Sequence, residues 1–257
     1  MLAAIFKRSP VIDDNSRAWM FDTFAWAIEH LGTDFFTKES KLVLPTNEFY
    51  PGKVSSIHEM ASSIFAKTVE YAGMTKWPLR LVEPQYFHQN QLPSVKVSQE
   101  IRGKEAQVFV QDESHQFFDV SYIPSQVNQP QDLISYFVQV LATILATNQP
   151  IPPPGGKESL NQSIDLVACY MGFGVIFSNT AYQFRGGCGS CNNPRLNRQS
   201  SLAEQETIYA LAIFAYLKRI PAKEVTPHIK SHLRSTFKRS LKDIAQFANT
   251  QKFLTIN

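Results

Sequence analysis

Cysteine is scarce in this chain of 257 residues, which contains only Cys169, Cys188 and Cys191. An odd and low number does not build the disulfide framework of a small secreted protein, so we expect a reducing compartment. Because 44% of the chain is hydrophobic and 12% aromatic, a packed core can form without cross-links. The composition therefore predicts a folded cytoplasmic protein.

A large charge excess is also missing. The formal net charge is +3, and charged residues make up 18% of the chain. A basic stripe lies near the C-terminus, at Lys230, Arg234, Lys238 and Lys242. A solvated helix face explains this stripe as well as phosphate contacts do, and no aromatic side chains that could stack on bases are interleaved with it. We therefore do not expect a nucleic-acid partner.

No uninterrupted hydrophobic run reaches the roughly 20 residues that a membrane span needs. The most apolar segment, IDLVACYMGFGVIFSNTAY, is interrupted by Asp165 and Asn179. The N-terminal MLAAIFKRSP places its basic residues after a short apolar run, which is the reverse of a secretory signal. These features predict a protein without a membrane partner.

The common catalytic motifs are absent as well: the chain has no Gly-rich phosphate loop, no G-x-S-x-G and no G-x-G-x-x-G after a strand. One motif remains, because Cys188 and Cys191 form a C-x-x-C within GGCGSCNNP. Two thiolates at this spacing bind zinc or exchange with a disulfide. A structural zinc needs four ligands, and Cys169 is the only further thiol. A zinc site, a thiol-redox site and an inert loop all remain open.

Helical periodicity and composition mark six segments, and Gly or Pro marks several of their ends. The first helix has N-cap candidates at Asp14, Asn15 and Ser16 and a stop at Gly32. Pro130 begins the third helix, as the fixed φ of proline allows. The predicted helices lie at about 13–32, 55–73, 128–149, 160–184, 202–220 and 227–249.

Short β-like pieces lie between these helices. KLVLP is predicted to be a short strand ended by Pro45. The pieces LRLVE, SVKVSQEI, AQVFV and FDVSYI predict a small, mostly antiparallel sheet of about three to five strands. The segment PIPPPGGKES is expected to be a linker or lid, since its prolines exclude it from a helix interior. The order of elements predicts an α+β single domain over residues 1–257, with a sheet-containing part at about 1–125 and a helical C-terminal part at about 130–250.

Polar residues in the apolar helices raise a separate question. In DLISYFVQVLATILA, Gln139 and Thr143 lie four residues apart and therefore share one helix face. Thr143 could donate to the carbonyl four residues back, and Gln139 could lie at the edge of the buried face. Asp165 precedes strongly apolar residues, so its carboxylate must be paired, cap a helix or serve a function.

Four separated blocks resemble a family of bacterial proteins of unknown function: DTFAWAIEHLGTDFFTKESKLVLPTNEFYPG, AGMTKWPLRLV, IDLVACYMGFGVIFSN and SLAEQETIYALAIFAYLKR. Many members of that family look like small zincin-type zinc peptidases, with H-E-x-x-H on the helix after the sheet. In register with that motif, this chain has Gln139 and Thr143 in place of the two His residues, and Val140 in place of the Glu. Asp165 matches an acidic position of the following helix.

This departure from the motif argues against peptidase chemistry. Gln139 and Thr143 are poor zinc ligands, and Val140 cannot take a proton from a metal-bound water. The resemblance therefore implies a minimal zincin-like fold that has lost its metal site. We expect a non-catalytic protein that binds a protein partner or a small ligand at the degenerate cleft near Gln139, Thr143 and Asp165. The alternative is a metal-binding or thiol-redox protein that uses Cys188 and Cys191.

Overall fold

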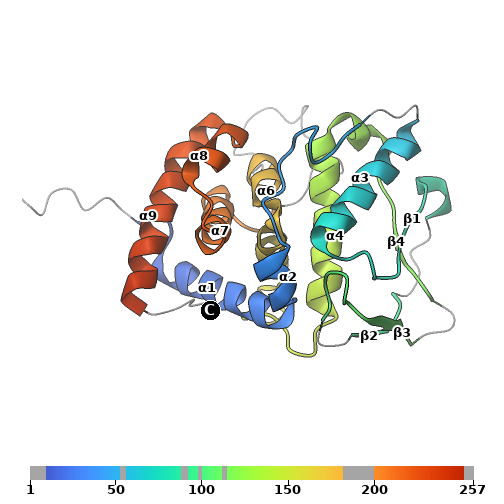
Figure 1. Ribbon diagram of the computed structural model, residues 1–257, viewed down its shortest axis with the longest axis horizontal. Helices are drawn as coiled ribbons and strands as arrows, with labels where there is room; N and C mark the ends of the chain where they lie inside the picture. Colours follow the sequence, from blue (N-terminus) through green and yellow to red (C-terminus); the bar gives the residue numbers. More distant parts are fainter. Residues whose placement is uncertain are drawn as a thin grey trace, which may run out of the picture.

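The computed structural model describes residues 10–52, 56–87, 92–97, 100–111, 115–181 and 200–251. Figure 1 shows a mostly helical molecule whose strands lie at one edge. The longer helices are α1 (Asp14–His30), α2 (Thr33–Lys38), α3 (Ile57–Ala72), α4 (Pro130–Thr147), α5 (Leu160–Ala168), α6 (Gly174–Thr180), α7 (Glu204–Leu217) and α9 (Arg234–Gln251). The shorter helical elements are η1 (Pro84–Tyr86), η2 (Pro124–Asn128), η3 (Cys169–Phe173), α8 (Ala222–Val225), η4 (Thr226–His228) and η5 (Ser231–Leu233).

The predicted α+β class with a helical C-terminal half is confirmed. The strands β1 (Leu79–Leu81), β2 (Val95–Val97), β3 (Val108–Val110) and β4 (Phe118–Val120) lie within the four predicted β-like pieces. They form two separate pairs: β1 runs parallel to β4, and β2 runs antiparallel to β3. Pro78 directly precedes β1 and cannot donate to a ladder, in agreement with the start of the strand at Leu79.

Local signals place the helix ends. The carboxylate of Asp13 accepts from the backbone N–H groups of Asn15 and Ser16, so the N-cap of α1 is one residue earlier than the predicted candidates. Helix α3 begins with a capping box between Ser56 and Glu59, and it ends at Gly73 in the left-handed conformation.

The prediction of a strand at KLVLP is wrong, because residues 41–45 have no regular secondary structure. The N–H of Val43 donates to the carbonyl of Gly172 at 2.9 Å rather than to a neighbouring strand. Gly172 has φ +99°, and a Cβ built there would lie 2.2 Å from the carbonyl oxygen of Lys41. Glycine therefore permits both the kink and the close approach of this segment.

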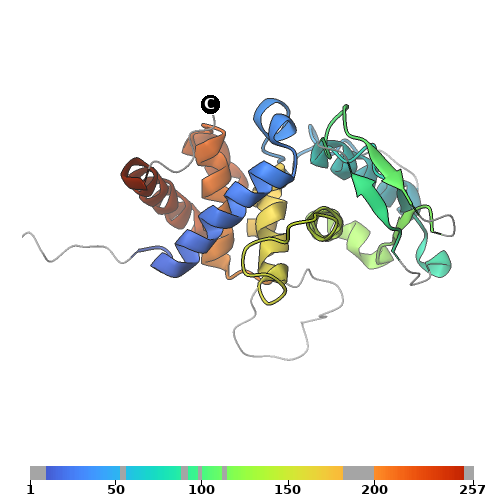
Figure 2. The same ribbon diagram turned by 90° about the horizontal axis from the view of Figure 1, so that it is seen from below.

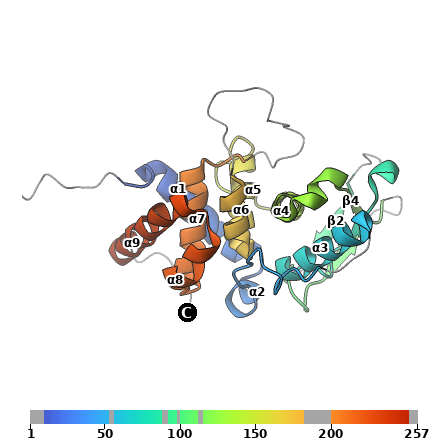
Figure 3. The same cartoon turned by 90° about the horizontal axis from the view of Figure 1, so that it is seen from above.

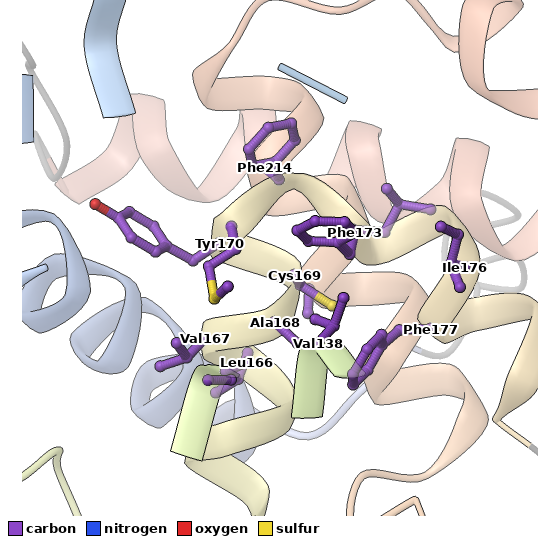
Figure 4. Packing of buried hydrophobic residues seen from close by; sticks show 14 of the residues in the cluster. Val138, Leu166, Val167, Ala168, Cys169, Tyr170, Phe173, Ile176, Phe177 and Phe214 are labelled. Atoms are coloured by element: carbon purple, nitrogen blue, oxygen red, sulfur yellow. The ribbon is translucent and has the colours of Figure 1, made fainter. Parts of the chain in front are cut away.

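The kink lies within the central helical segment of the molecule, where α5, the π-helical turn η3 and α6 follow one another directly. Figure 4 shows Cys169, Phe173 and Phe177 of this segment packed near Val138 of α4. By length and composition alone, the stretch Leu160–Thr180 could cross a membrane, but 83% of its most apolar window is buried inside the protein. Burial in the core accounts for its apolarity.

The first helix packs against C-terminal elements. The rings of Phe21 and Phe247 stack at 4.8 Å between α1 and α9, and α1 also packs against α5. Figure 2 shows α1 crossing beside the C-terminal helices, and Figure 3 shows α3 and α4 on the opposite side next to the strands.

The PIPPPGGKES segment is fastened to α1. The indole N–H groups of Trp19 and Trp26 donate to the carbonyls of Pro154 and Ile151, both at 3.0 Å. The segment is non-helical up to Ser159, as its prolines predict. These two anchors hold it against the first helix.

The last helix begins later than predicted, at Arg234 rather than near Pro227. The side chain of Asn179 accepts from the N–H of Lys230 at 3.1 Å and donates to the carbonyl of His228 at 2.9 Å. Ile229 and Lys230, between these two bonds, have an extended backbone, so η4 and η5 remain separate turns.

One cation is fully buried. The guanidinium of Arg102 donates to the carbonyl of Ala72 at 2.7 Å and lies over the rings of Phe35 and Tyr170. Burial lowers the pKa of Arg102, and the nearby Tyr170 opposes this shift. The Nη1 atom of Arg102 has no partner among the described residues. The contacts of the Arg102 guanidinium with the faces of two aromatic rings thus stabilise its buried charge.

Candidate functional site

The helix face that the resemblance assigns to a lost zinc site is occupied by ordinary helix interactions. Gln139, Val140 and Thr143 lie on α4 and are all partly buried. The hydroxyl of Thr143 donates to the carbonyl of Gln139 at 2.8 Å, and Thr147 repeats this bond to Thr143. Such bonds back to the preceding turn are common for Thr in helices. The hydroxyl of Thr143 is therefore already used within its own helix.

Asp165 has a structural partner. It is fully buried on α5, five residues after the start of that helix, so it does not cap its own helix. Its Oδ2 accepts from the backbone N–H groups of Ser201 at 2.8 Å and Leu202 at 3.1 Å, just before α7. Two backbone donors stabilise a buried carboxylate and tie α5 to the start of α7.

Of the three cysteines, Cys169 lies within the described residues. Cys169 is a buried cysteine in η3. Cys188 and Cys191 lie outside the described residues, so the possible zinc at this C-x-x-C stays a prediction. Within the ranges that the structure describes, no three His, Cys, Asp or Glu side chains lie close enough together to hold a metal ion.

A cavity of about 330 Å³ lies between α3, the N-terminal turn of α4 and the loop 45–52. We call it the α3–α4 cavity. Its volume is at the lower end of the range of small-molecule sites. It is lined by Pro45, Thr46, Asn47, Tyr50, Pro51, Gly52, Met60, Ser63, Ile64, Pro130, Gln131 and Ile134. None of these lining side chains carries a carboxylate, ammonium, guanidinium or imidazole group.

The cavity has an apolar floor and a more polar mouth. Ile64 and Ile134 are 4% and 1% exposed and form its deepest apolar surface. Asn47 and Gln131 are exposed and lie at its rim. The hydroxyl oxygen of Thr46 is buried and has no hydrogen-bond partner among the described residues. A buried, unpartnered hydroxyl is costly unless water or a ligand satisfies it.

The loop that closes the cavity is anchored at two points. The hydroxyl of Tyr71 donates to the carbonyl of Phe49 at 2.7 Å, and the hydroxyls of Tyr50 and Thr68 lie 3.3 Å apart. Burial raises the pKa of Tyr50, so its phenol stays protonated. These contacts hold the wall of the cavity in place against α3.

Hydrogen bonds between side-chain amides orient Gln131 at the rim of the cavity. Asn179 binds the backbone on both sides of Ile229, which fixes its oxygen toward Lys230 and its nitrogen toward His228. The same nitrogen donates to the Oε1 of Gln131 at 3.1 Å. Amide orientations are assigned from such networks, and here the network leaves the Gln131 NH₂ group for other partners. Within the described part of the chain, that NH₂ group donates to no protein atom.

Sequence reasoning missed this cavity. Its residues come from the neighbouring segments 45–52 and 60–64 and from the distant segment 130–134, and the polar ones are ordinary surface types. The one available signal was the Pro- and Asn-containing stretch LPTNEFYPG, whose composition is typical of a loop rather than of a strand end.

Comparison of the chain with protein-family models, with curated proteins and with solved structures found no match. The zincin resemblance thus has no support beyond the quoted sequence blocks.

Proposed function

We propose that this protein is a non-catalytic binding protein whose small-molecule ligand occupies the α3–α4 cavity. The observation that carries the proposal is a concave, largely apolar space with the exposed Gln131 at its rim, whose NH₂ group donates to no protein atom among the described residues. Concave apolar sites with a few convergent polar groups are typical of ligand-binding sites. Its described lining residues offer no acid, base or nucleophile pair for catalysis.

This proposal moves the binding site away from the face formed by Gln139, Val140 and Thr143. That face remains a prediction from the resemblance, but its Thr143 hydroxyl bonds its own helix and Asp165 holds the approach to α7. The α3–α4 cavity lies at the other end of α4, around Gln131 and Ile134.

Thermal unfolding in the presence of a panel of uncharged small molecules tests the proposal, because a ligand that binds only the folded state raises Tm. The variant Ser63→Phe adds a ring at the cavity wall. Ala66→Phe adds the same ring to an exposed position of α3 that does not line the cavity, and it serves as the matched control.

We expect at least one compound to raise the Tm of the wild type and of Ala66→Phe but not of Ser63→Phe. If Ser63→Phe responds as the wild type does, the ligand does not occupy this cavity and the proposal fails. The proposal also fails if no compound raises Tm.

A role for Cys188 and Cys191 in metal or redox chemistry also stays a prediction. Elemental analysis of the purified protein tests the metal form. One equivalent of zinc that is lost in Cys188→Ser would support this site, and a metal-free protein would contradict it.

A further inference from the structure

We infer that the α3–α4 cavity selects an uncharged ligand that inserts an apolar chain and presents a hydrogen-bond acceptor, such as an amide carbonyl, at the mouth. This inference rests on the proposed function, since it names the ligand class for the same cavity. Three properties of the lining carry it: its lack of charge, its apolar floor and the direction of its rim donor.

The lack of charge excludes an ionic head group inside the cavity. Among the described lining residues, no side chain is ionised at neutral pH, since the Tyr50 phenol keeps its proton. A carboxylate or an ammonium group in this space would lose its hydration without gaining an opposite charge, which is strongly unfavourable. A neutral polar group pays a much smaller desolvation cost and can be satisfied by hydrogen bonds alone.

The floor determines which end of the ligand enters first. Ile64 and Ile134 are buried, and Met60 and Tyr50 add further apolar surface beside them. The exposed side chains of Asn47 and Gln131 are at the rim. An amphipathic ligand therefore gains most when its apolar chain points inward and its polar group stays near the mouth.

The rim donor determines the polarity of that group. Gln131 is held by Asn179 through its carbonyl oxygen, so it offers an N–H donor to the cavity mouth. Asn179 cannot reverse without breaking its bonds to the backbone of His228 and Lys230. Gln131 therefore favours a hydrogen-bond acceptor on the ligand.

Three probes with the same alkyl chain separate these properties: octanamide, octanoate and octylammonium. Isothermal titration of the wild-type protein near neutral pH should show octanamide binding at least about tenfold more tightly than either ion. Equal or tighter binding of octanoate or octylammonium would overturn the inference while leaving a ligand-binding cavity in place.

A substitution at the rim tests the direction of the donor. Gln131→Glu keeps the shape of the side chain and its bond from Asn179, but the second oxygen can only accept. We expect octanamide binding to weaken about tenfold and octylammonium binding to become detectable. Gln129→Glu adds the same charge two residues away, outside the lining, and should leave both probes unchanged. If both variants behave alike, charge rather than the Gln131 donor controls binding, and the inference fails.

Different results would contradict ligand binding in the α3–α4 cavity and the preference for an uncharged ligand. If no alkyl probe binds and the uncharged panel raises no Tm, the cavity is not a ligand site and the proposed function falls with the inference. If the panel yields a ligand that Ser63→Phe blocks, but octanamide shows no preference over the ions, only the ligand class is wrong.

Discussion

The helical half of the molecule, α4 to α9, and the sheet-bearing part, β1 to β4 with their connections, use aromatic side chains differently. In the helical half, Phe173, Phe177 and Phe214 are completely buried. In the sheet-bearing part, Tyr86 and Phe109 are 67% and 58% exposed. Phe118 of β4 is 1% exposed, but the short strands and their connections leave Tyr86 and Phe109 uncovered, whereas consecutive helices enclose the three Phe side chains.

This difference indicates that the helical half carries most of the stability and that the sheet-bearing part tolerates change. The α3–α4 cavity lies where α3, which packs against η2 near the strands, meets the start of α4. A site at such a junction can be altered without dismantling the core. Substitutions in the two parts should therefore change the free energy of unfolding by different amounts.

Gly172→Ala should be the most damaging change. An added Cβ would lie 2.2 Å from the Lys41 carbonyl oxygen, at a residue with φ +99°. Backbone strain together with overpacking predicts a loss of about 3–5 kcal/mol in the free energy of unfolding, measured by urea denaturation.

Gly156→Ala is the matched control for this change, because Gly156 also has positive φ but an added Cβ meets nothing within 4 Å. It should lose only about 1–2 kcal/mol. Equal losses in the two variants would show that the contact with residues 41–43 is unimportant.

Asp165→Ala should cost about 2–3 kcal/mol, because the partly buried N–H of Ser201 and the buried N–H of Leu202 would lose a charged acceptor. Asp165→Asn keeps an acceptor and should lose less. Urea denaturation of both variants measures the difference, and unchanged stability in Asp165→Ala would show that this carboxylate does not support the helical half.

Alkaline pH should weaken the helical half. Burial raises the pKa of the Tyr170 phenol to about 12, although the nearby Arg102 opposes the shift. In the unfolded chain the phenol titrates near pH 10, so its contribution is complete below about pH 10 and is lost as the pH rises to about 12. This loss is on the order of 2–3 kcal/mol.

Tyr170→Phe removes this titration and should therefore show a smaller decrease in the free energy of unfolding between about pH 9 and about pH 11. The control is Tyr86→Phe, since Tyr86 is exposed in the sheet-bearing part. An identical pH dependence of wild type and Tyr170→Phe would contradict the assignment.

Arg80→Ala should have a small effect, although its geometry is good. Arg80 pairs with Asp119 through two bonds, at 2.7 and 2.9 Å, between β1 and β4. Its side chain is 54% exposed, so solvent screens the pair and the expected loss is below about 1 kcal/mol by thermal or urea unfolding. A loss as large as that of Asp165→Ala would remove the contrast between the two parts.

Thr143→Val should change almost nothing. Among the described residues, the hydroxyl of Thr143 bonds only to the carbonyl of Gln139 in its own helix, and valine has nearly the same shape. We expect a change within about 0.5 kcal/mol in urea unfolding and unchanged octanamide binding. A specific loss of ligand binding would instead support the degenerate cleft that the resemblance implies.

Local patterns were sufficient to predict much of the fold. The alternating Val95 and Val97 and the matching Val108 and Val110 marked β2 and β3, while Pro130 and Gly73 marked helix ends. These signals depend on neighbours in the chain, where periodicity and backbone conformation are directly readable.

The candidate site was not predictable in the same way. Asn179 and Gln131 are 48 residues apart, and the orientation of both amides depends on backbone groups near Ile229. The segment KLVLP had the composition of a strand, but its N–H at Val43 bonds to a kink that exists only in the folded core. Such contacts follow from tertiary packing, which no local pattern encodes.

A crystal structure of the protein with octanamide tests the central claim most directly. The account predicts that the alkyl chain lies against Ile64 and Ile134 and that the amide oxygen lies about 3 Å from the amide nitrogen of Gln131. An empty α3–α4 cavity, or octanamide bound instead beside Gln139 and Thr143, would contradict it.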